Sequence, residues 1–314
     1  MKKILCAVLA LAAMTSCSND YTIDYNKEAI AFGEAFVDNS TRADYSSGKS
    51  IDAFKVYGIL TGSGNTVQIF NGANVARPTG LASGVYDPDE AWICNEVQYW
   101  VPNASYEFAA IVDGVATDTN GLPETIPFTV ADGDDNKDLL YATATATTNG
   151  DGTPNVNLVA FTFDHLLSKV QFTVANTMAA DYSIEVKGIT VEGAKEDGLY
   201  TIETETWAKT TEDTVSSLTF GTTGVIASAN TAVASATRQI LPVEQTLAVT
   251  IAYDIYCKGT KVSSATKSGT IPAQTYQKNT VYNITAEIDA NKIEFTVNSV
   301  NGFNTPTIED EVEY

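Results

Sequence analysis

Residues 159–174 have the sequence VAFTFDHLLSKVQFTV, and this stretch decides the expected fold of the chain. On both sides of its centre apolar side chains recur at every second position, as they do in half-buried β-strands. The residues DHLLS at 164–168 interrupt this pattern and predict a single turn. Because the turn lies near the middle of the chain, we expect a domain boundary there, within about ten residues. The expected domains are residues 43–166 and 167–314.

The rest of the chain also has the composition of β-strands. Threonine, valine, alanine, isoleucine and tyrosine are abundant, whereas leucine, lysine and glutamate are scarce. Alternating runs lie between clusters of glycine, asparagine and aspartate that predict turns. A length of 314 residues suits two domains, so we expect an all-β chain of two tandem β-sandwiches. The expected strands are residues 53–60, 67–70, 106–112, 158–163, 169–174, 183–191, 246–256, 280–288 and 292–300.

The charge balance excludes several classes of partner. The chain has 39 acidic and 18 basic residues, for a net charge of −21. Nucleic acids and anionic lipids require a surplus of basic residues, so we expect no nucleic-acid partner. One histidine and four cysteines provide few metal ligands, and the sequence contains no phosphate-binding loop, CxxC or HExxH motif. We therefore expect no cofactor, no metal and no catalytic residue.

Two local patterns superficially suggest chemistry. Residues 132–138, DGDDNKD, resemble a calcium-binding loop, but Lys137 and Thr143 stand where an EF-hand requires glycine and glutamate. We interpret this segment as a solvated acidic turn. His165 is the only histidine, and its acidic and hydroxyl neighbours in sequence do not make a triad. We interpret His165 as a side chain packed at the domain junction.

The first residues predict an export signal. Two lysines precede an apolar run of 11 residues, Ile4–Met14. A spanning helix needs about 20 residues, so residues 1–16 are predicted to be a signal peptide. Small residues then precede Cys17, which resembles a lipoprotein processing site. Cleavage before Cys17 leaves a thiol for a diacylglycerol group, and the neutral Ser18 fits onward transfer to an outer membrane.

Residues 29–45, AIAFGEAFVDNSTRADY, predict a strand followed by a polar stretch. Ile30, Phe32 and Phe36 are expected on one face of this strand. Arg42 lies among small residues, and an arginine in such a loop is a good protease site.

Residues 292–303, KIEFTVNSVNGF, predict a terminal strand before an acidic tail. Ile293, Phe295 and Val297 share one face, so this strand could fill the same kind of slot as residues 29–37. The match alone is not specific, since most half-buried strands look alike.

Two cysteines are expected to remain as thiols after export. Cys6 leaves with the signal peptide and Cys17 is acylated, which leaves Cys94 and Cys257. An exported compartment permits a disulfide, but the two cysteines are far apart in sequence. We favour two buried free thiols over a bridge.

Four stretches resemble the fimbrillin family, the subunits of type V pili in anaerobic Gram-negative bacteria of the gut and mouth. They are the Cys17 site, residues 32–43 (similar to the family's prosegment and cleavage site), residues 138–142 (DLLYA) and residues 159–174, which contain the pattern F-x-H-x-x-S/A-K. The pairs at 241–242 and 279–282 fit more loosely. Many relatives have a tryptophan near the end of the last core strand, where residues 300–303 here are VNGF.

The resemblance implies two tandem transthyretin-like β-sandwiches and a lipidated precursor at the outer membrane. It also implies that an arginine-specific protease cuts between Arg42 and Ala43 and removes residues 17–42. Loss of the strand with Ile30, Phe32 and Phe36 would open a groove with unpaired backbone groups. A donor strand from another copy or another pilus subunit would then enter it, and the expected donor residues are Ile293, Phe295 and Val297.

The expected function is therefore that of a stalk subunit of an extracellular pilus that supports adhesion. Two alternatives within the family are an anchor, which keeps its lipid and stays uncut, and a tip, which accepts a strand. A monomeric glycan-binding surface lipoprotein is an alternative of another class. Exposed aromatic side chains would favour it, and Trp92, Tyr99 and Trp100 are the candidates. We nevertheless interpret these three as core aromatic residues of the first sandwich.

Overall fold

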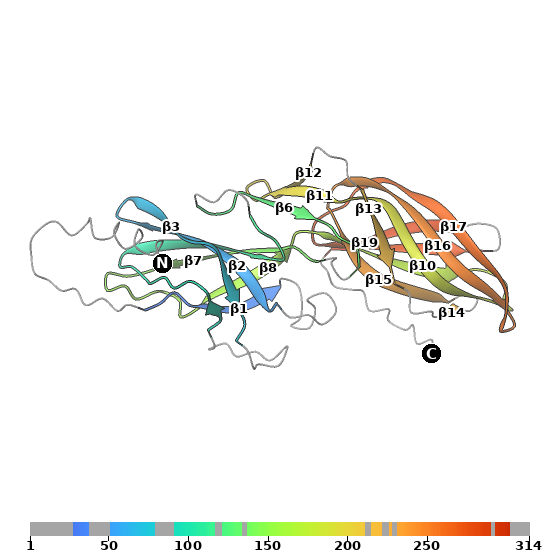
Figure 1. The fold of residues 1–314 in the computed structure, drawn as a ribbon, viewed down its shortest axis with the longest axis horizontal. Coiled ribbons are helices and arrows are strands. Elements are labelled where there is room, and N and C mark those ends of the chain that lie inside the picture. The colour runs from blue at the N-terminus through green and yellow to red at the C-terminus, as the bar shows by residue number, and fades with distance from the viewer. Residues whose placement is uncertain are drawn as a thin grey trace, which may run out of the picture.

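A computed structural model describes residues 28–37, 51–78, 91–116, 121–133, 137–210, 215–221, 226–227, 231–289 and 293–301. All regular structure in these ranges is β-strand, which confirms the predicted all-β class. The strands form two units that follow one another along the long axis of the molecule (Figure 1). No helix that could span a bilayer occurs among these residues.

The first unit is a seven-stranded sheet in the order β1-β8-β7-β5-β2-β3-β4. β1 runs parallel to β8, and the other neighbours are antiparallel. Bridges between Phe32 and Trp92 and between Ala29 and Tyr99 join the two ends of the sheet, so the sheet wraps around one apolar core. Its strands are β1 (Phe32–Val37), β2 (Ala53–Gly62), β3 (Asn65–Ala76), β4 (Ile93–Cys94), β5 (Ala104–Val112), β7 (Leu140–Thr147) and β8 (Val159–His165).

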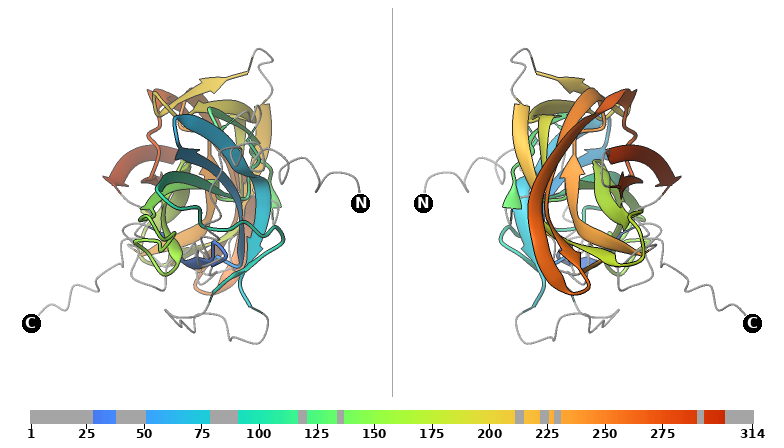
Figure 2. Two further views of the ribbon diagram at one scale, coloured as in Figure 1. Left: turned by 90° about the vertical axis from the view of Figure 1, so that its left-hand side faces the viewer. Right: turned by 90° about the vertical axis from the view of Figure 1, so that its right-hand side faces the viewer.

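The second unit is a sandwich of two sheets, ordered β13-β10-β16-β17 with β14 beside β10, and β15-β9-β18-β19. The sheets pack through apolar side chains such as Phe172 and Phe220, whose ring centroids are 4.9 Å apart. Among the residues that the structure describes, β19 pairs only with β18, and it lies at the outside of the unit (dark red in Figure 2). The strands are β9 (Ser168–Asn176), β10 (Tyr182–Lys195), β13 (Val215–Phe220), β14 (Ile226–Ala227), β15 (Ala232–Ile240), β16 (Glu244–Cys257), β17 (Thr260–Thr275), β18 (Thr280–Ile288) and β19 (Ile293–Asn301).

A third, small sheet connects the two units. β6 (Thr125–Thr129) lies in the range expected for the first domain, yet it pairs with β11 (Asp197–Thr201), which in turn pairs with β12 (Thr206–Lys209). Side chains from the first half of the chain, including Ile111, Ile126 and Leu139, therefore belong to the same core cluster as the second unit. The sequence patterns did not predict this crossing.

The link between the units is shorter than the expected turn at residues 164–168. β8 ends at His165 and β9 begins at Ser168, so only Leu166 and Leu167 lie between them. Both are almost fully buried. The amide of Leu166 donates to the carbonyl of Leu139, and the carbonyl of Leu167 accepts from the amide of Asn279. These contacts fix the link in place, and both leucine side chains belong to the apolar cluster that continues into the second unit.

Candidate strand-binding site

The first strand expected in the sequence is present as β1, and it lies inside the molecule. Ile30 and Phe32 are buried at 5% and 0% exposure. The backbone of Phe36 pairs with Thr162, while its side chain lies outside the described part. Simple alternation does not continue along the strand, because the register with β8 shifts between Phe32 and Ala35. The shift brings Val37 into the core with Phe32, although alternation had assigned it to the opposite face.

Phe32 lies at the centre of the aromatic core of the first unit. Its ring centroid is 5.4 Å from that of Phe70, 5.9 Å from Phe108, 6.1 Å from Phe161 and 6.4 Å from Phe54. These four rings come from β3, β5, β8 and β2, so one side chain of the N-terminal segment packs against most of the sheet. Aromatic side chains dominate core energetics because each buries a large apolar area.

The backbone around Phe32 is hydrogen-bonded on both sides. On one side, the amide of Val159 donates to the carbonyl of Ala31 (2.9 Å). On the other side lies a segment of residues 92–100, which we call the strap. The amide of Ile30 donates to Gln98 (2.8 Å), and the carbonyl of Phe32 accepts from Trp92 (2.8 Å). Residues 28–37 therefore occupy the place of an interior strand between β8 and the strap.

Removal of this segment would leave a slot with two open edges. Carbonyl and amide groups of the strap and β8 would lose their partners, and buried unpaired backbone groups are costly. The four rings around Phe32 would line an apolar socket at the same place. A slot of this kind accepts an extended strand through main-chain hydrogen bonds and alternate side chains.

The predicted donor residues lie on β19, at the edge of the second unit. Ile293, Phe295 and Val297 are partly buried on one face, and the intervening Glu294 and Thr296 are exposed. The Phe295 ring lies directly over Gly269 of β17, where a Cβ atom would collide with it. In this structure the donor face is thus packed on the strand's own unit.

The remaining predicted processing residues lie outside the described part of the chain. These are Cys17, the predicted lipid attachment residue, and Arg42 and Ala43, which flank the predicted cut. Lipidation and cleavage therefore stay predictions.

The patterns that superficially suggested chemistry have structural partners. His165 Nδ1 lies 2.7 Å from Asp138 Oδ2, and both side chains are 2% exposed. This buried pair ties the end of β8 to the residues before β7. Asp132 of the acidic turn accepts a hydrogen bond from the amide of Thr219 (2.8 Å) and lies 3.6 Å from Arg238 Nε. Partial burial acts to raise the pKa of Asp132, but these contacts outweigh it and the pKa is lowered overall.

The three aromatic residues proposed as a glycan platform do not share one exposed face. Trp100 is 1% exposed and packs against the ring of Tyr106, with centroids 4.7 Å apart. Trp92 is half-buried against Phe54, and only Tyr99 is strongly exposed. Two of the three therefore belong to the core and its margin.

Both expected thiols are free, and each is half-buried rather than fully buried. Burial raises the pKa of the Cys94 thiol. A raised pKa keeps the thiol protonated and unreactive. Cys94 lies in β4 within the strap, whereas Cys257 ends β16.

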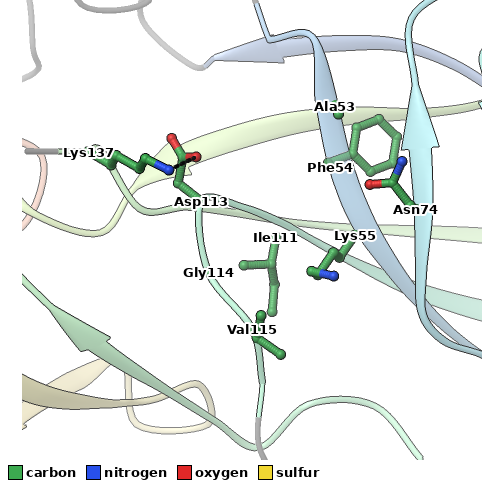
Figure 3. Close-up of a pocket in the computed structure, with 9 residues that line it drawn as sticks. All are labelled: Ala53, Phe54, Lys55, Asn74, Ile111, Asp113, Gly114, Val115 and Lys137. Carbon is green, nitrogen blue, oxygen red and sulfur yellow. Dashed lines mark ion pairs between the residues drawn. The ribbon is translucent and has the colours of Figure 1, made fainter. Parts of the chain in front are cut away.

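A shallow hollow of about 270 Å³, open to solvent, lies where β2, β3 and the end of β5 meet. Figure 3 shows Asp113 and Lys137 pointing toward one another at its rim, with 3.9 Å between the charged atoms. The hollow is also lined by Phe54, Lys55 and Asn74. It adjoins the Phe32 site only through Phe54, and it is lined by both polar and apolar side chains.

The strap is the main part of the site that sequence reasoning missed. Its sequence does not alternate between apolar and polar residues. Only two residues of the strap form a regular strand, which is β4. The one available signal was the pair Trp92 and Trp100, which are the two end residues of the strap and pack against the core.

Comparison with known proteins adds a family and a fold. A family model described as fimbrillin-like matches residues 41–310. A crystal structure of a fimbrial protein from Bacteroides vulgatus is similar, with a TM-score of 0.58 and 18% identity over 88% of this chain and 98% of that chain.

Two further solved structures have similar folds. A candidate cell adhesion protein from Bacteroides uniformis gives a TM-score of 0.54 at 15% identity, covering 87% of this chain and 97% of that one. A candidate cell adhesion protein from Bacteroides ovatus gives a TM-score of 0.52 at 13% identity, covering 88% of this chain and 98% of that one. At these identities the likeness concerns the fold alone. No match was found among curated proteins.

Proposed function

Because the chain belongs to the fimbrillin-like family, we propose that it is a structural subunit of a cell-surface pilus and serves in the stalk. It is exported as a lipoprotein with its lipid on Cys17, is cut between Arg42 and Ala43 and polymerises by donor-strand exchange. The observation that carries this proposal is the position of Phe32, which is fully buried among four rings yet lies on the N-terminal side of the predicted cut.

The physical argument starts from the uncut precursor. Residues 28–37 complete the core of the first unit and satisfy the backbone of both neighbours, so the precursor is stable as a monomer. A cut at Arg42 separates this strand from the rest of the chain. Once the strand leaves, the open slot favours the binding of an extended strand from another subunit. Because donor and acceptor surfaces differ, each addition creates the next site, and a filament grows.

The partners follow from this cycle. They are other copies of the chain, other pilus subunits, an arginine-specific protease and, for the precursor, the outer membrane through its lipid. The mature subunit is extracellular and supports adhesion. The proposal requires no catalytic residue and no cofactor.

The test uses a soluble Cys17→Ser precursor treated with an arginine-specific protease. We expect the new N-terminus at Ala43 by mass spectrometry, followed by ladders of oligomers on unboiled gels. The matched control is the same precursor with Arg42→Ala, which we expect to stay uncut and monomeric.

The other outcomes separate the alternatives. A clean cut without ladders would point to a tip subunit. No cut at Arg42 would point to an anchor or to a monomeric surface protein, and would refute the stalk role. A separate comparison of membrane fractions tests the lipid: we expect Cys17→Ser to release the precursor, and unchanged fractionation would refute lipidation.

A further inference from the structure

The place of residues 28–37 requires a particular side-chain pattern from any strand that refills it. Ile30 and Phe32 are two positions apart, so both point into the core from the same face. The Phe32 socket is formed by aromatic rings and suits a large apolar side chain. The Ile30 position, 5% exposed, suits a smaller aliphatic one. A refilling strand that runs parallel to β8 must therefore contain an aliphatic residue, any residue and then an aromatic residue.

β19 contains this pattern in the same order. Ile293 and Phe295 are separated by the exposed Glu294, as Ile30 and Phe32 are separated by Ala31. Within residues 289–314 the other phenylalanine is Phe303, and with Phe303 in the socket Asn301 would take the Ile30 position. A buried amide there would lack apolar complementarity and would be costly.

The sequence Val312-Glu313-Tyr314 also fits the pattern, but it is less suitable for the site. The Tyr314 hydroxyl would be buried among four phenylalanine rings, and phenylalanine side chains offer it no hydrogen-bond acceptor. The terminal carboxylate would also lie next to the socket, where burial of a charge is unfavourable.

Burial and backbone pairing both favour the transfer of β19 into the slot. At its present place β19 is an edge strand whose one partner among the described strands is β18, and Phe295 is only partly buried. In the slot the strand would have two neighbours, β8 and the strap, and Phe295 would take a position that is fully buried. Deeper burial of apolar surface is stabilising, so the socket favours the exchanged state.

We propose that a second copy of this chain inserts its β19 parallel to β8, with Phe295 in the Phe32 socket and Ile293 in the place of Ile30. This inference rests on the proposed function and adds the register to it. Because Phe32 lies opposite Val159, the proposed register puts Phe295 opposite Val159. A regular donor strand, without the register shift that β1 has between Phe32 and Ala35, then brings Thr296 beside Ala160. Thr296 and Ala160 are both exposed, so they would lie on the outer face of the joined sheet.

A disulfide test determines the register without altering the core. Cys17, Cys94 and Cys257 are first replaced by serine to remove the native cysteines. One chain then has Ala160→Cys and a second has Thr296→Cys, and the two are cut, mixed and oxidised. Cα atoms opposite one another in neighbouring strands are within the range that a disulfide can span. We expect a bond between residues 160 and 296 of different copies, identified by peptide mass spectrometry.

The matched control mixes the same Ala160→Cys chain with a chain that carries Asn304→Cys. Residue 304 would lie beside residue 160 if Phe303 filled the socket. Ladders that contain a 160–304 bond, or ladders that contain neither bond, would overturn the proposed register while leaving strand exchange intact. Absence of ladders in the chain without the new cysteines would refute strand exchange between copies of this chain. The two failures are therefore distinguishable.

A second pair of variants tests the anchor residue. We expect Phe295→Ala to slow ladder formation at least tenfold and Phe303→Ala to leave the rate unchanged. Circular dichroism of each precursor establishes that the chain is folded before it is cut. Equal rates for Phe295→Ala and the parent chain would overturn the anchor role. If Phe295→Ala does not fold, the disulfide result decides the register by itself.

Discussion

At the scale of single residues, Phe32 has two roles that are seldom combined. It has the burial and ring contacts of a central core residue, yet it belongs to a segment that the proposed cut removes. Its packing stabilises the precursor, and the same packing defines the socket that remains. Under the proposed strand exchange, the stability of the precursor and the affinity for a donor strand would therefore depend on the same group of rings.

We predict that Phe32→Ala destabilises the uncut precursor by about 3–5 kcal/mol, as is typical when a buried phenylalanine is truncated. Urea denaturation of Cys17→Ser, Arg42→Ala precursors measures the free energy of unfolding. Tyr99→Ala is the control, because Tyr99 also lies beside the N-terminal strand but is 52% exposed. We expect its effect to stay within about 0.5 kcal/mol. Similar losses for both variants would contradict the central position of Phe32.

At the scale of strands, β19 is held by fewer contacts than an interior strand. It pairs with β18 on one side and has no strand pairing on the other within the described residues. Its apolar face lies across β17, where Gly269 leaves room for the Phe295 ring. A glycine in a strand often marks such a close approach.

We predict that Gly269→Val displaces β19 from β17, because the new side chain would occupy the space of the Phe295 ring. Hydrogen exchange of the β19 amides should become faster. Gly188→Ala is the control, since a Cβ there meets no atom within 4 Å and Gly188 also lies in a strand. Unchanged exchange in Gly269→Val would show that the ring does not hold the strand.

A charged cluster on the outer face of the second unit predicts a pH dependence. Hydrogen bonds from Lys261 and Ser264 lower the pKa of Asp254 to about 2. Lys261 Nζ lies 2.8 Å and Lys187 Nζ 3.5 Å from its carboxylate. Since the pKa in the folded state is below the unfolded value of about 3.9, Asp254 stabilises the fold above about pH 4. This contribution is lost as the pH falls towards 2.

We therefore predict that Asp254→Asn is less stable than the parent chain at pH 6 and that the difference shrinks between about pH 4 and pH 2. Urea denaturation at several pH values measures it. Asp181→Asn is the control, because Asp181 forms an exposed pair with Lys258 at 3.6 Å, and exposed pairs contribute little. A difference that stays constant down to pH 2 would contradict the ion-pair account.

At the scale of the whole molecule, the two units share structure at their junction. β6 of the first half pairs with β11 of the second, and Trp207 Nε1 donates to the carbonyl of Leu166 (2.7 Å). One apolar cluster continues from Ile126 in β6 into the second sandwich. The two units are therefore coupled through one continuous core.

We predict that the Cys17→Ser, Arg42→Ala precursor unfolds in one calorimetric transition, because neither unit can lose its core without exposing part of the other. Ile126→Ala should lower the midpoint of that transition, since Ile126 is fully buried in the shared cluster. The expected cost is about 2–5 kcal/mol. Two separate transitions in the parent chain would contradict the coupling.

The sequence was sufficient for the all-β class, for the two strands that flank residues 164–168 and for the span of β18. These features depend on alternation and turn residues, which are local properties of the chain. The motifs around Cys17, residues 32–43 and residues 159–174 also pointed to the fimbrillin family, which the family model confirms. The neighbours of His165 in sequence do not make a catalytic triad, so we interpret this histidine as a packed side chain. The structure shows that it is buried.

The tertiary structure alone decided which strands are neighbours. Nothing local in the sequence indicated that the strap pairs with Ile30 and Phe32, that β6 crosses to β11, or that the register of β1 shifts at Gly33 and Glu34. Backbone groups are the same at every residue, so the chain pattern does not specify a partner strand; that choice depends on which side chains fill one shared core. Phe32 was recognisable in the sequence as an apolar strand residue, but its place among four rings from four strands exists only in the folded molecule.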